Sequence, residues 1–129
     1  MRLDNAFGIH EQALKLRSRR AELLASNMAN ADTPGFKARD IDFKQALKGE
    51  VVKQAQIKTT HKNHISTPTS SLSPAHLLYR IPSQPSLDGN TVDMQQEKTV
   101  FAANTLEYQA SLGFLTGKIK GLKSAIRGD

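Results

Sequence analysis

The chain of 129 residues lacks cysteine and tryptophan altogether, and its aromatic residues are limited to five phenylalanines and two tyrosines. The absence of cysteine excludes disulfides, and it is compatible with either an oxidising or a reducing compartment. Only 38% of the residues are apolar. Such a composition offers little material for a compact core, so a large globular centre is not expected.

Long hydrophobic runs are also missing. No stretch approaches the roughly 20 apolar residues that span a bilayer, and the N-terminus, MRLDNAFGIHEQALKLRSRR, lacks the apolar run of a secretory signal. If the protein leaves the cytoplasm, we expect it to use another route. The net charge is +6, and the excess lies in residues 44–87, where six Lys/Arg stand against one acidic residue.

Near the N-terminus, apolar residues recur every seven positions. The repeat consists of Phe7, Leu14, Ala21 and Met28, with Leu24 on an adjoining position. This spacing predicts an amphipathic assembly helix within residues 1–31. His10 and Arg17 fall where a stable coiled coil would carry leucine, so the isolated helix should be marginal.

The C-terminal segment, residues 88–129, has a more regular repeat. One row is Met94, Phe101, Tyr108, Leu115 and Leu122, and its companions four residues later are Thr105, Leu112, Ile119 and Ile126. The pattern predicts a helix from about residue 93 to residue 127, roughly 50 Å long at 1.5 Å per residue. Thr91 or Asp93 is the expected N-cap, after a turn at residues 88–90.

Gly113, Gly117 and Gly121 form a row at intervals of four within this predicted helix. Lysines at 118, 120 and 123 exclude a membrane span. Each glycine costs a helix on the order of 1 kcal/mol relative to alanine, so their presence needs an explanation. We expect them to allow close approach of a neighbouring helix in an assembly.

Between the two helices the sequence changes character twice. Asn30 marks a helix end, and Pro34 and Gly35 suit the central positions of a type II turn, followed by an extended segment to residue 43. Residues 44–87 are rich in Ser, Thr, Pro and His and read as a largely irregular linker. Its expected exceptions are a short helical turn around residues 43–47 and an apolar cluster at residues 77–81.

Two motifs resemble a known family. LASNMANADTPGFKARDIDF, residues 24–43, is similar to the N-terminal signature of the bacterial flagellar rod and hook proteins. DGNTVDMQQE at 88–97 and NTLEYQASLGFLTGKIKGLKSAIRG at 104–128 resemble the C-terminal half of its proximal rod members. Met28 stands where leucine is commoner in the signature, a change that keeps volume and apolarity. By position, the assembly motif comprises Asn27, Asn30, Thr33, Pro34, Gly35, Phe36, Asp88, Gly89, Asn90, Asn104 and Tyr108.

The resemblance implies an all-α, elongated protein whose N- and C-terminal amphipathic helices form a coiled-coil-like pair. It implies a structural subunit that stacks around a central channel in the periplasmic rod, with no cofactor and no catalytic residue. Export would pass through the flagellar type III system without a cleaved signal peptide. The implied partners are other copies of the chain, FlgC-, FlgF- and FlgG-like rod subunits, a FliE-like adaptor, the MS ring and the export gate. The seven-residue repeats and the glycine row, for their part, predict the helix-packing residues: Phe7, Leu14, Leu24, Met28, Met94, Phe101, Leu112, Leu115, Ile119, Leu122, Gly113, Gly117 and Gly121.

Other functions have weaker signals. The histidines at 61, 64 and 76 lie in a Ser/Pro-rich segment without cysteine, which favours a solvated loop over a zinc site. KLRSRR at 15–20 suggests a basic nucleic-acid-binding helix as the alternative function, but acids at 11 and 22 flank it and favour a solvated helix face. No nucleophile with its base, paired carboxylates or phosphate loop can be placed on one rigid element, so neither an enzyme nor a small-molecule substrate is expected.

Overall fold

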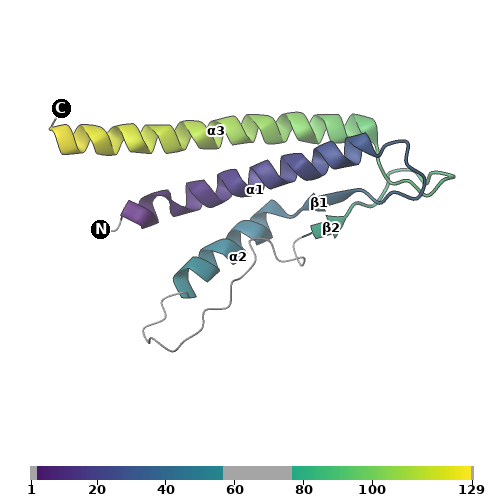
Figure 1. Ribbon diagram of the computed structural model, residues 1–129, viewed down its shortest axis with the longest axis horizontal. Coiled ribbons are helices and arrows are strands. Elements are labelled where there is room, and N and C mark those ends of the chain that lie inside the picture. Colours follow the sequence, from purple (N-terminus) through teal and green to yellow (C-terminus); the bar gives the residue numbers. More distant parts are fainter. Residues whose placement is uncertain (1–2, 57–76, 129) are drawn as a thin grey trace.

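Two long helices run side by side in opposite directions and define the shape of the protein. The computed structural model describes residues 3–56 and 77–128. Helix α1 spans Leu3–Ala29 and helix α3 spans Met94–Arg127, and they form an elongated antiparallel pair (Figure 1). The predicted all-α architecture is confirmed, with a small sheet added beside α1, on the side away from α3 (Figure 1).

The sheet and a third helix lie against the pair. Strand β1, Arg39–Ile41, is antiparallel to strand β2, Leu77–Tyr79, and Asp40 is opposite Leu78. Helix α2 spans Phe43–Gln56. The part expected to be an irregular linker is therefore more ordered than the sequence indicated, since α2 has 14 residues where only a turn was expected. The histidines at 61, 64 and 76 lie outside the described residues.

Helix α2 extends beyond a turn because its first residues join the main apolar cluster. That cluster contains Leu16 and Leu23 of α1, Ile41 of β1 and Ala46 of α2, with Phe43, Leu47 and Leu77 packed against it. The i, i+3, i+4 spacing of 43, 46 and 47 places these three side chains on one helix face. Burial of that face stabilises α2 despite the unfavourable helix propensity of Gly49.

Helix α3 begins and ends with well-formed caps. The Asp93 carboxylate accepts hydrogen bonds from the backbone amides of Gln95 and Gln96, so the second of the two expected N-caps is the one used. At the other end Gly128 has a φ of 77°, and its amide donates to the Ser124 carbonyl. This left-handed glycine is a common helix stop.

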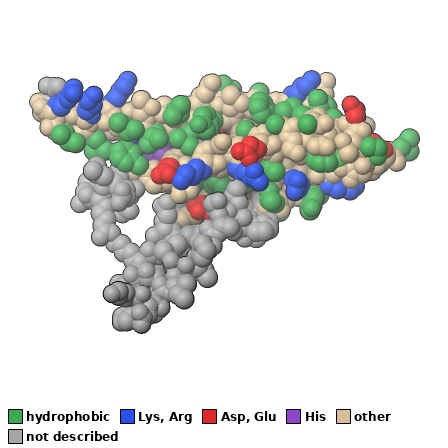
Figure 2. Space-filling view, viewed as in Figure 1, with side chains coloured by type: hydrophobic (Ala, Val, Ile, Leu, Met, Phe, Trp, Pro, Cys, Tyr) green, Lys and Arg blue, Asp and Glu red, His purple; other side chains and the backbone are tan. Residues whose placement is uncertain are grey.

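The row of α3 that faces α1 differs in part from the expected one. Phe101, Leu115 and Leu122 of the expected row are partly buried. The buried residues beside this row are Glu97 and Asn104, which follow Met94 and Phe101 by three positions, whereas the expected companions follow the row by four. The expected companions are exposed in the described chain: Thr105, Leu112, Ile119 and Ile126. The seam between the helices is therefore partly polar, and the apolar members of the expected companion row are left exposed. Figure 2 shows hydrophobic side chains at many places on the surface of the helix pair.

None of the described helices combines the length and the apolarity needed to cross a bilayer.

Candidate assembly site

The turn after α1 has the geometry expected from its sequence. The Phe36 amide donates to the Thr33 carbonyl at 3.3 Å, and Gly35 has a φ of 72°. These two features confirm a type II turn with Pro34 and Gly35 at its centre. Asn30 supports the helix end, because its side-chain amide donates to the Ser26 carbonyl at 2.8 Å.

Asn90 joins this turn to the segment that leads into α3. Its side-chain nitrogen donates to the carbonyls of Asn30, Ala31 and Thr33 at 3.0, 2.9 and 2.8 Å. Its side-chain oxygen accepts from the Val92 amide at 2.8 Å. Carbonyl groups at the C-terminal end of a helix lack an N–H donor within the helix. Here Asn90, about 60 positions later in the sequence, donates to carbonyls that directly follow α1.

Further hydrogen bonds align residues 88–91 with residues 35–38. The Gly35 amide donates to the Asp88 carbonyl at 2.8 Å, and the Thr91 amide donates to the Phe36 carbonyl at 3.0 Å. The Lys37 ammonium donates to the Gly89 carbonyl at 2.7 Å. We call this connection, residues 27–38 with residues 88–91, the joint. It fixes where α3 begins relative to where α1 ends.

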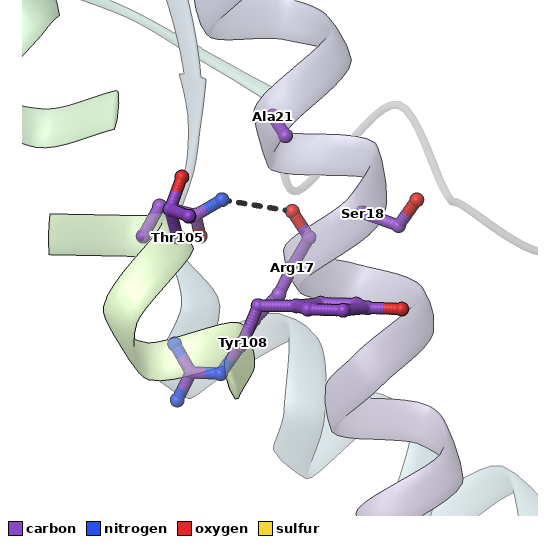
Figure 3. Close-up of a pocket in the computed structure, with 6 residues that line it drawn as sticks. Arg17, Ser18, Ala21, Thr105 and Tyr108 are labelled. Atoms are coloured by element: carbon purple, nitrogen blue, oxygen red, sulfur yellow. Dashed lines mark hydrogen bonds between the residues drawn. The ribbon is translucent and has the colours of Figure 1, made fainter. Parts of the chain in front are cut away.

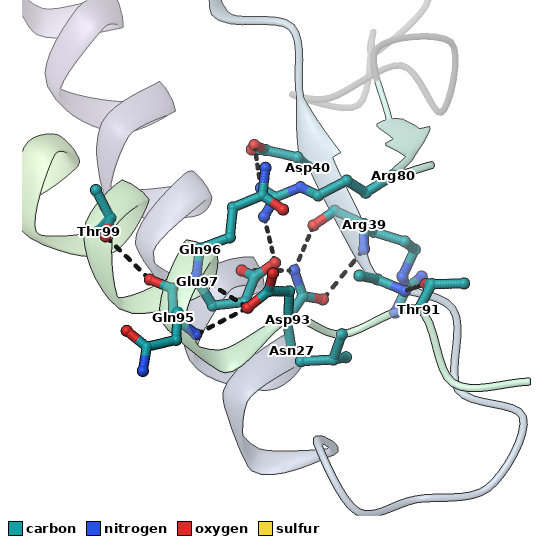
Figure 4. Close-up of polar contacts among 12 residues, drawn as sticks. Asn27, Arg39, Asp40, Arg80, Thr91, Asp93, Gln95, Gln96, Glu97 and Thr99 are labelled. Atoms are coloured by element: carbon teal, nitrogen blue, oxygen red, sulfur yellow. Dashed lines mark hydrogen bonds and ion pairs between the residues drawn. The ribbon is translucent and has the colours of Figure 1, made fainter. Parts of the chain in front are cut away.

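Beside the joint, a partly buried cluster of charges links α1, β1, the segment after β2 and α3. Arg20 of α1 forms a two-pronged ion pair with Asp40 of β1, at 2.8 and 2.9 Å, and Arg80 after β2 donates to the same carboxylate at 2.7 Å. Arg80 also pairs with Glu97 of α3. We call these four residues the charge cluster, and two cations balance two carboxylates within it. Figure 4 shows Asp40, Arg80 and Glu97 directed towards one another.

Asn27 is the first residue of the joint and also binds Glu97 of the charge cluster. The Asn27 side chain is 1% exposed, and its nitrogen donates to the Arg39 carbonyl at 2.8 Å and to Glu97 at 3.2 Å. Its oxygen accepts from the Arg39 amide at 3.1 Å. Glu97 is fully buried. The side-chain amide of Asn27, on α1, therefore satisfies groups of both β1 and α3, a task that no apolar residue could perform.

The two carboxylates of the charge cluster shift in opposite directions. Burial disfavours ionisation of Asp40, but hydrogen bonds from Arg20, the Ile41 amide and Arg80 outweigh it and lower the pKa of Asp40. For Glu97, burial is the stronger effect and raises the pKa despite Asn27 and Arg80. The hydrogen bond to Asp40 also raises the pKa of Arg20. Asp40 is thus the firmly ionised member of the pair.

The stability supplied by Asp40 should be lost in acid. Its folded pKa lies below its unfolded value, so its contribution is present above about pH 3.9 and disappears as the pH falls through the folded pKa. We expect Asp40→Asn to be destabilising at pH 7 and progressively closer to the parent as the pH falls below 4. Urea unfolding across this range measures the difference. Exposed Asp32→Asn is the control, and an Asp40→Asn deficit that is constant with pH would contradict the assignment.

Arg17 makes a second contact between the two helices. The side-chain nitrogen of Asn104 donates to the Arg17 carbonyl at 3.0 Å, and the Arg17 guanidinium binds Ser111 at 3.3 Å and pairs with Glu107. The guanidinium also lies 4.1 Å from the centre of the Phe43 ring. A small hollow lies beside this contact, lined in part by Thr105 and Tyr108 (Figure 3). Arg17, which was expected to weaken the contact between the helices, therefore binds α1 to α3.

This arrangement corrects the interpretation of KLRSRR as a solvated helix face. Arg17 binds α3 and Arg20 binds β1, whereas Arg19 is the exposed one and pairs with Glu22 at 2.5 Å. Arg17 and Arg20 therefore face the rest of the fold, and Arg19 is the one of the three arginines that faces solvent. The correction follows from the helical period, because positions 17 and 20 lie nearly on one face and position 19 does not.

The structure gathers most of the predicted assembly motif into the joint: Asn27, Asn30, Thr33, Pro34, Gly35, Phe36, Asp88, Gly89 and Asn90. Asn104 and Tyr108 lie farther along α3, beside Arg17. Sequence reasoning missed the charge cluster. One signal was present: Glu97, Asn104 and Ser111 are spaced by seven and form a polar row on α3. Among the described residues no three His, Asp or Glu side chains are grouped to hold a metal ion.

A substitution at Gly35 tests the turn. The positive φ of 72° is accessible to glycine and tolerated by asparagine, but it is strained for a β-branched residue. No other atom lies within 4 Å of an added Cβ, so the cost is conformational. We expect Gly35→Val to lose about 2 kcal/mol of unfolding free energy and Gly35→Asn to lose clearly less. Denaturation followed by circular dichroism compares the two, and equal stabilities would show that the turn tolerates any residue.

Comparison with known proteins finds the same family across nearly the whole chain. A family model described as "Flagella basal body rod protein" matches residues 7–37. The flagellar basal body rod protein FlgB of Aeromonas hydrophila is 52% identical over 128 residues, which cover 98% of this chain and 96% of that protein. The FlgB proteins of Escherichia coli K12 and Salmonella typhimurium LT2 are 50% and 47% identical, with the same shares covered. The resemblance seen in the two motifs is confirmed.

Proposed function

The chain belongs to the family of flagellar basal body rod proteins named FlgB, and from this premise we propose that it is a structural subunit of the proximal rod. In this role, copies assemble helically around the export channel and link the membrane ring and export apparatus to the rest of the rod. The family is a structural component of the flagellum and not an enzyme family. The assembled chain would lie in the periplasmic part of the basal body after type III export.

The observation that carries the proposal is the joint. Asn90 binds three carbonyls at the end of α1, so the two motifs typical of the family form one connection between the terminal helices. A rod subunit must present its two helices to neighbours at a fixed angle. A connection with this many hydrogen bonds supplies that rigidity.

The surface of α3 is suited to neighbours. Several large apolar side chains of this helix are exposed in the single chain: Leu106, Leu112, Phe114, Ile119 and Ile126. Exposed apolar surface of this extent on one helix marks an interaction site more often than an ordinary surface. The proposed packing roles of Leu112 and Ile119 therefore belong to contacts between subunits, because α1 does not cover them.

The glycine row of α3 tests this proposal. Gly113, Gly117 and Gly121 are exposed, and an added Cβ at any of them would meet no other atom within 4 Å. Gly117→Leu should therefore stabilise α3 in the isolated chain by several tenths of a kcal/mol. In the rod, the same side chain should cost roughly 1 to 3 kcal/mol at a close helix contact. Circular dichroism of the purified protein and swimming of the variant strain measure the two effects.

Gly117→Ala is the matched control. Alanine raises helix propensity as well, but adds only a methyl group at the contact, so its strain should swim better than the Gly117→Leu strain. Normal swimming of the Gly117→Leu strain would show that the glycine face is not packed in the rod.

The function itself is tested by deletion of the gene, followed by complementation and isolation of basal bodies. We expect the deletion strain to lack rods and motility, and the complemented strain to contain this chain in its purified basal bodies by mass spectrometry. A motile deletion strain, or basal bodies without the chain, would overturn the proposal.

A further inference from the structure

The hollow beside Arg17 has the size of a site for one small molecule. Its volume is about 180 Å³, and its wall is mainly apolar. Three residues of α1 and three of α3 line it: Arg17, Ser18, Ala21, Asn104, Thr105 and Tyr108 (Figure 3). We call it the seam hollow. An apolar cavity of about 150 Å³ is large enough to bind benzene, so the seam hollow has room for one ring-sized molecule.

The seam hollow contains a buried hydrogen-bond acceptor. Asn104 is only 2% exposed, and its side-chain nitrogen donates to the Arg17 carbonyl at 3.0 Å. This bond fixes which way the amide points, because a carbonyl can only accept. The side-chain oxygen, Oδ1, is buried and receives no hydrogen bond from any residue that the structure describes. A buried acceptor without a donor is unfavourable, so a ligand that donates to Oδ1 would be stabilised there.

The neighbouring groups favour a neutral donor. The Thr105 hydroxyl donates to the Phe101 carbonyl at 3.0 Å, so its hydrogen is already used. The Arg17 guanidinium opposes a cationic ligand, and its own charge is paired with Glu107. Burial of an unpaired charge against a mainly apolar wall is costly for either sign. The donor that suits the seam hollow is therefore an uncharged group.

The apolar part of the wall indicates the body of the ligand. Tyr108 is 37% exposed, and its ring extends from α3 towards α1 (Figure 3). Aromatic rings pack favourably against a second ring in an offset or edge-to-face arrangement. Ala21 is the small side chain of the opposite helix at this place and leaves the room unfilled. A ring or a short hydrocarbon fits between these two residues.

We propose that the seam hollow binds a neutral hydroxyl compound of about the size of phenol. The hydroxyl donates to Asn104 Oδ1, and the apolar body lies against Ala21 and the Tyr108 ring. A free phenol or alcohol carries this chemistry, and so does a tyrosine side chain. The proposal is independent of the role in the rod. It gives a use to Asn104 and Tyr108, the two residues of the assembly motif that lie outside the joint.

Titration of the purified full chain with phenol tests the proposal without changing the protein. The ¹⁵N-labelled chain is followed by NMR at the side-chain amide of Asn104, and we expect saturable shifts with a Kd on the order of 1 mM. Anisole, the methyl ether of phenol, keeps the ring and the oxygen but has no hydrogen to donate. It should bind at least tenfold more weakly. Equal affinities, or no saturable shift with phenol, would overturn the proposal.

A pair of alanine substitutions tests the location. Ala21→Leu fills the seam hollow and should remove the phenol-dependent shifts. Ala103→Leu is the matched control, because Ala103 is exposed on α3 and does not line the hollow, and it should bind phenol like the parent. Circular dichroism checks that both variants are helical. Unchanged phenol affinity in a helical Ala21→Leu variant would overturn the assignment of the site.

Two amino-acid amides distinguish the sources of the hydroxyl. N-acetyltyrosinamide carries the phenol on a peptide-like backbone, and N-acetylphenylalaninamide lacks only the hydroxyl. Binding of the tyrosine compound within tenfold of phenol, and lost with the phenylalanine compound, would assign the seam hollow to a tyrosine side chain. Weaker binding of the tyrosine compound would assign it to a free small molecule. Equal binding of both amides would contradict a hydrogen bond to Asn104.

Discussion

Replacement of Arg80 by methionine is expected to remove about 3 to 5 kcal/mol of unfolding free energy at neutral pH. Arg80 binds both carboxylates of the charge cluster. Without Arg80, the buried Glu97 carboxylate would lose its cationic partner and keep the hydrogen bond from the Asn27 amide. An uncompensated buried charge costs far more than the ion pair contributes. Because the total stability of a small domain is roughly 5 to 15 kcal/mol, the loss would be a large fraction of it.

The pH dependence of the Arg80→Met variant distinguishes this cause from lost packing. The pKa of Glu97 is already raised by burial, and removal of Arg80 should raise it further. A raised folded pKa contributes stability at low pH that is lost as the pH rises, so the variant should be closer to the parent at pH 5 than at pH 8. Glu97→Gln added to Arg80→Met should recover part of the loss.

Arg19→Ala is the control for the Arg80 substitution. Arg19 pairs with Glu22 on the exposed side of α1, and such surface pairs contribute about 0.5 kcal/mol or less. Urea unfolding of the variants at the two pH values gives all the comparisons. A loss below 1 kcal/mol for Arg80→Met, or one that is independent of pH, would contradict the buried charge cluster.

Asn90→Ala is expected to cost about 3 kcal/mol and to loosen the joint. The substitution leaves the carbonyls of Asn30, Ala31 and Thr33 without this donor and the Val92 amide without its acceptor. The Asn30 and Thr33 carbonyls keep the amides of Thr33 and Phe36 as donors, so the main loss falls on the Ala31 carbonyl and the Val92 amide. A single buried polar group left without a partner costs roughly 1 to 3 kcal/mol, and water should moderate the sum. Asn90→Asp keeps the shape but has no amide hydrogens, so it should be no more stable than Asn90→Ala at neutral pH.

Hydrogen exchange shows where the effect of Asn90→Ala falls. We expect faster exchange of the Gly35 and Thr91 amides, whose partners lie across the joint. Amides in the middle of α3 should change only in proportion to global stability. Gln84→Ala, in the exposed loop of residues 81–88, is the control and should stay within about 0.5 kcal/mol of the parent. Unchanged exchange at the joint in Asn90→Ala would show that the three hydrogen bonds do not fix the two segments.

The features that could be predicted from the sequence are those with local signals. The seven-residue repeats identified both terminal helices, and Pro34 with Gly35 identified the turn that the structure confirms. Both depend on neighbours in the chain: a helix needs a regular apolar face, and a type II turn needs a glycine at its third position. Local sequence also limited the N-cap of α3 to two candidates, Thr91 and Asp93.

The charge cluster could not be predicted in this way. Arg20, Asp40, Arg80 and Glu97 are separated by long stretches of sequence, and charged residues are by default assigned to the surface. Only the fold brings them together. The polar row at 97, 104 and 111 was a missed signal that the seam of α3 is not purely apolar, but even this row could not have identified the partners of these residues.

The order of the middle segment depends on tertiary contacts. Helix α2 is rich in strong helix formers, but a helix of only 14 residues is marginal without tertiary contacts. Packing of Phe43, Ala46 and Leu47 against the core stabilises it. Strand β2 has only three residues and needs β1 as its partner, so its sequence alone could not establish it.

A density map of basal bodies purified from the bacterium that makes this protein tests the central claim most directly. The claim is that the chain builds the proximal rod through two terminal helices fixed by the joint. We predict that density at the membrane-proximal end of the rod fits antiparallel α1 and α3, with residues 33–36 against residues 88–91 and neighbouring subunits packed on the glycine row of α3. A proximal rod fully accounted for by other chains, or one in which the two helices of this chain lie apart, would contradict the account.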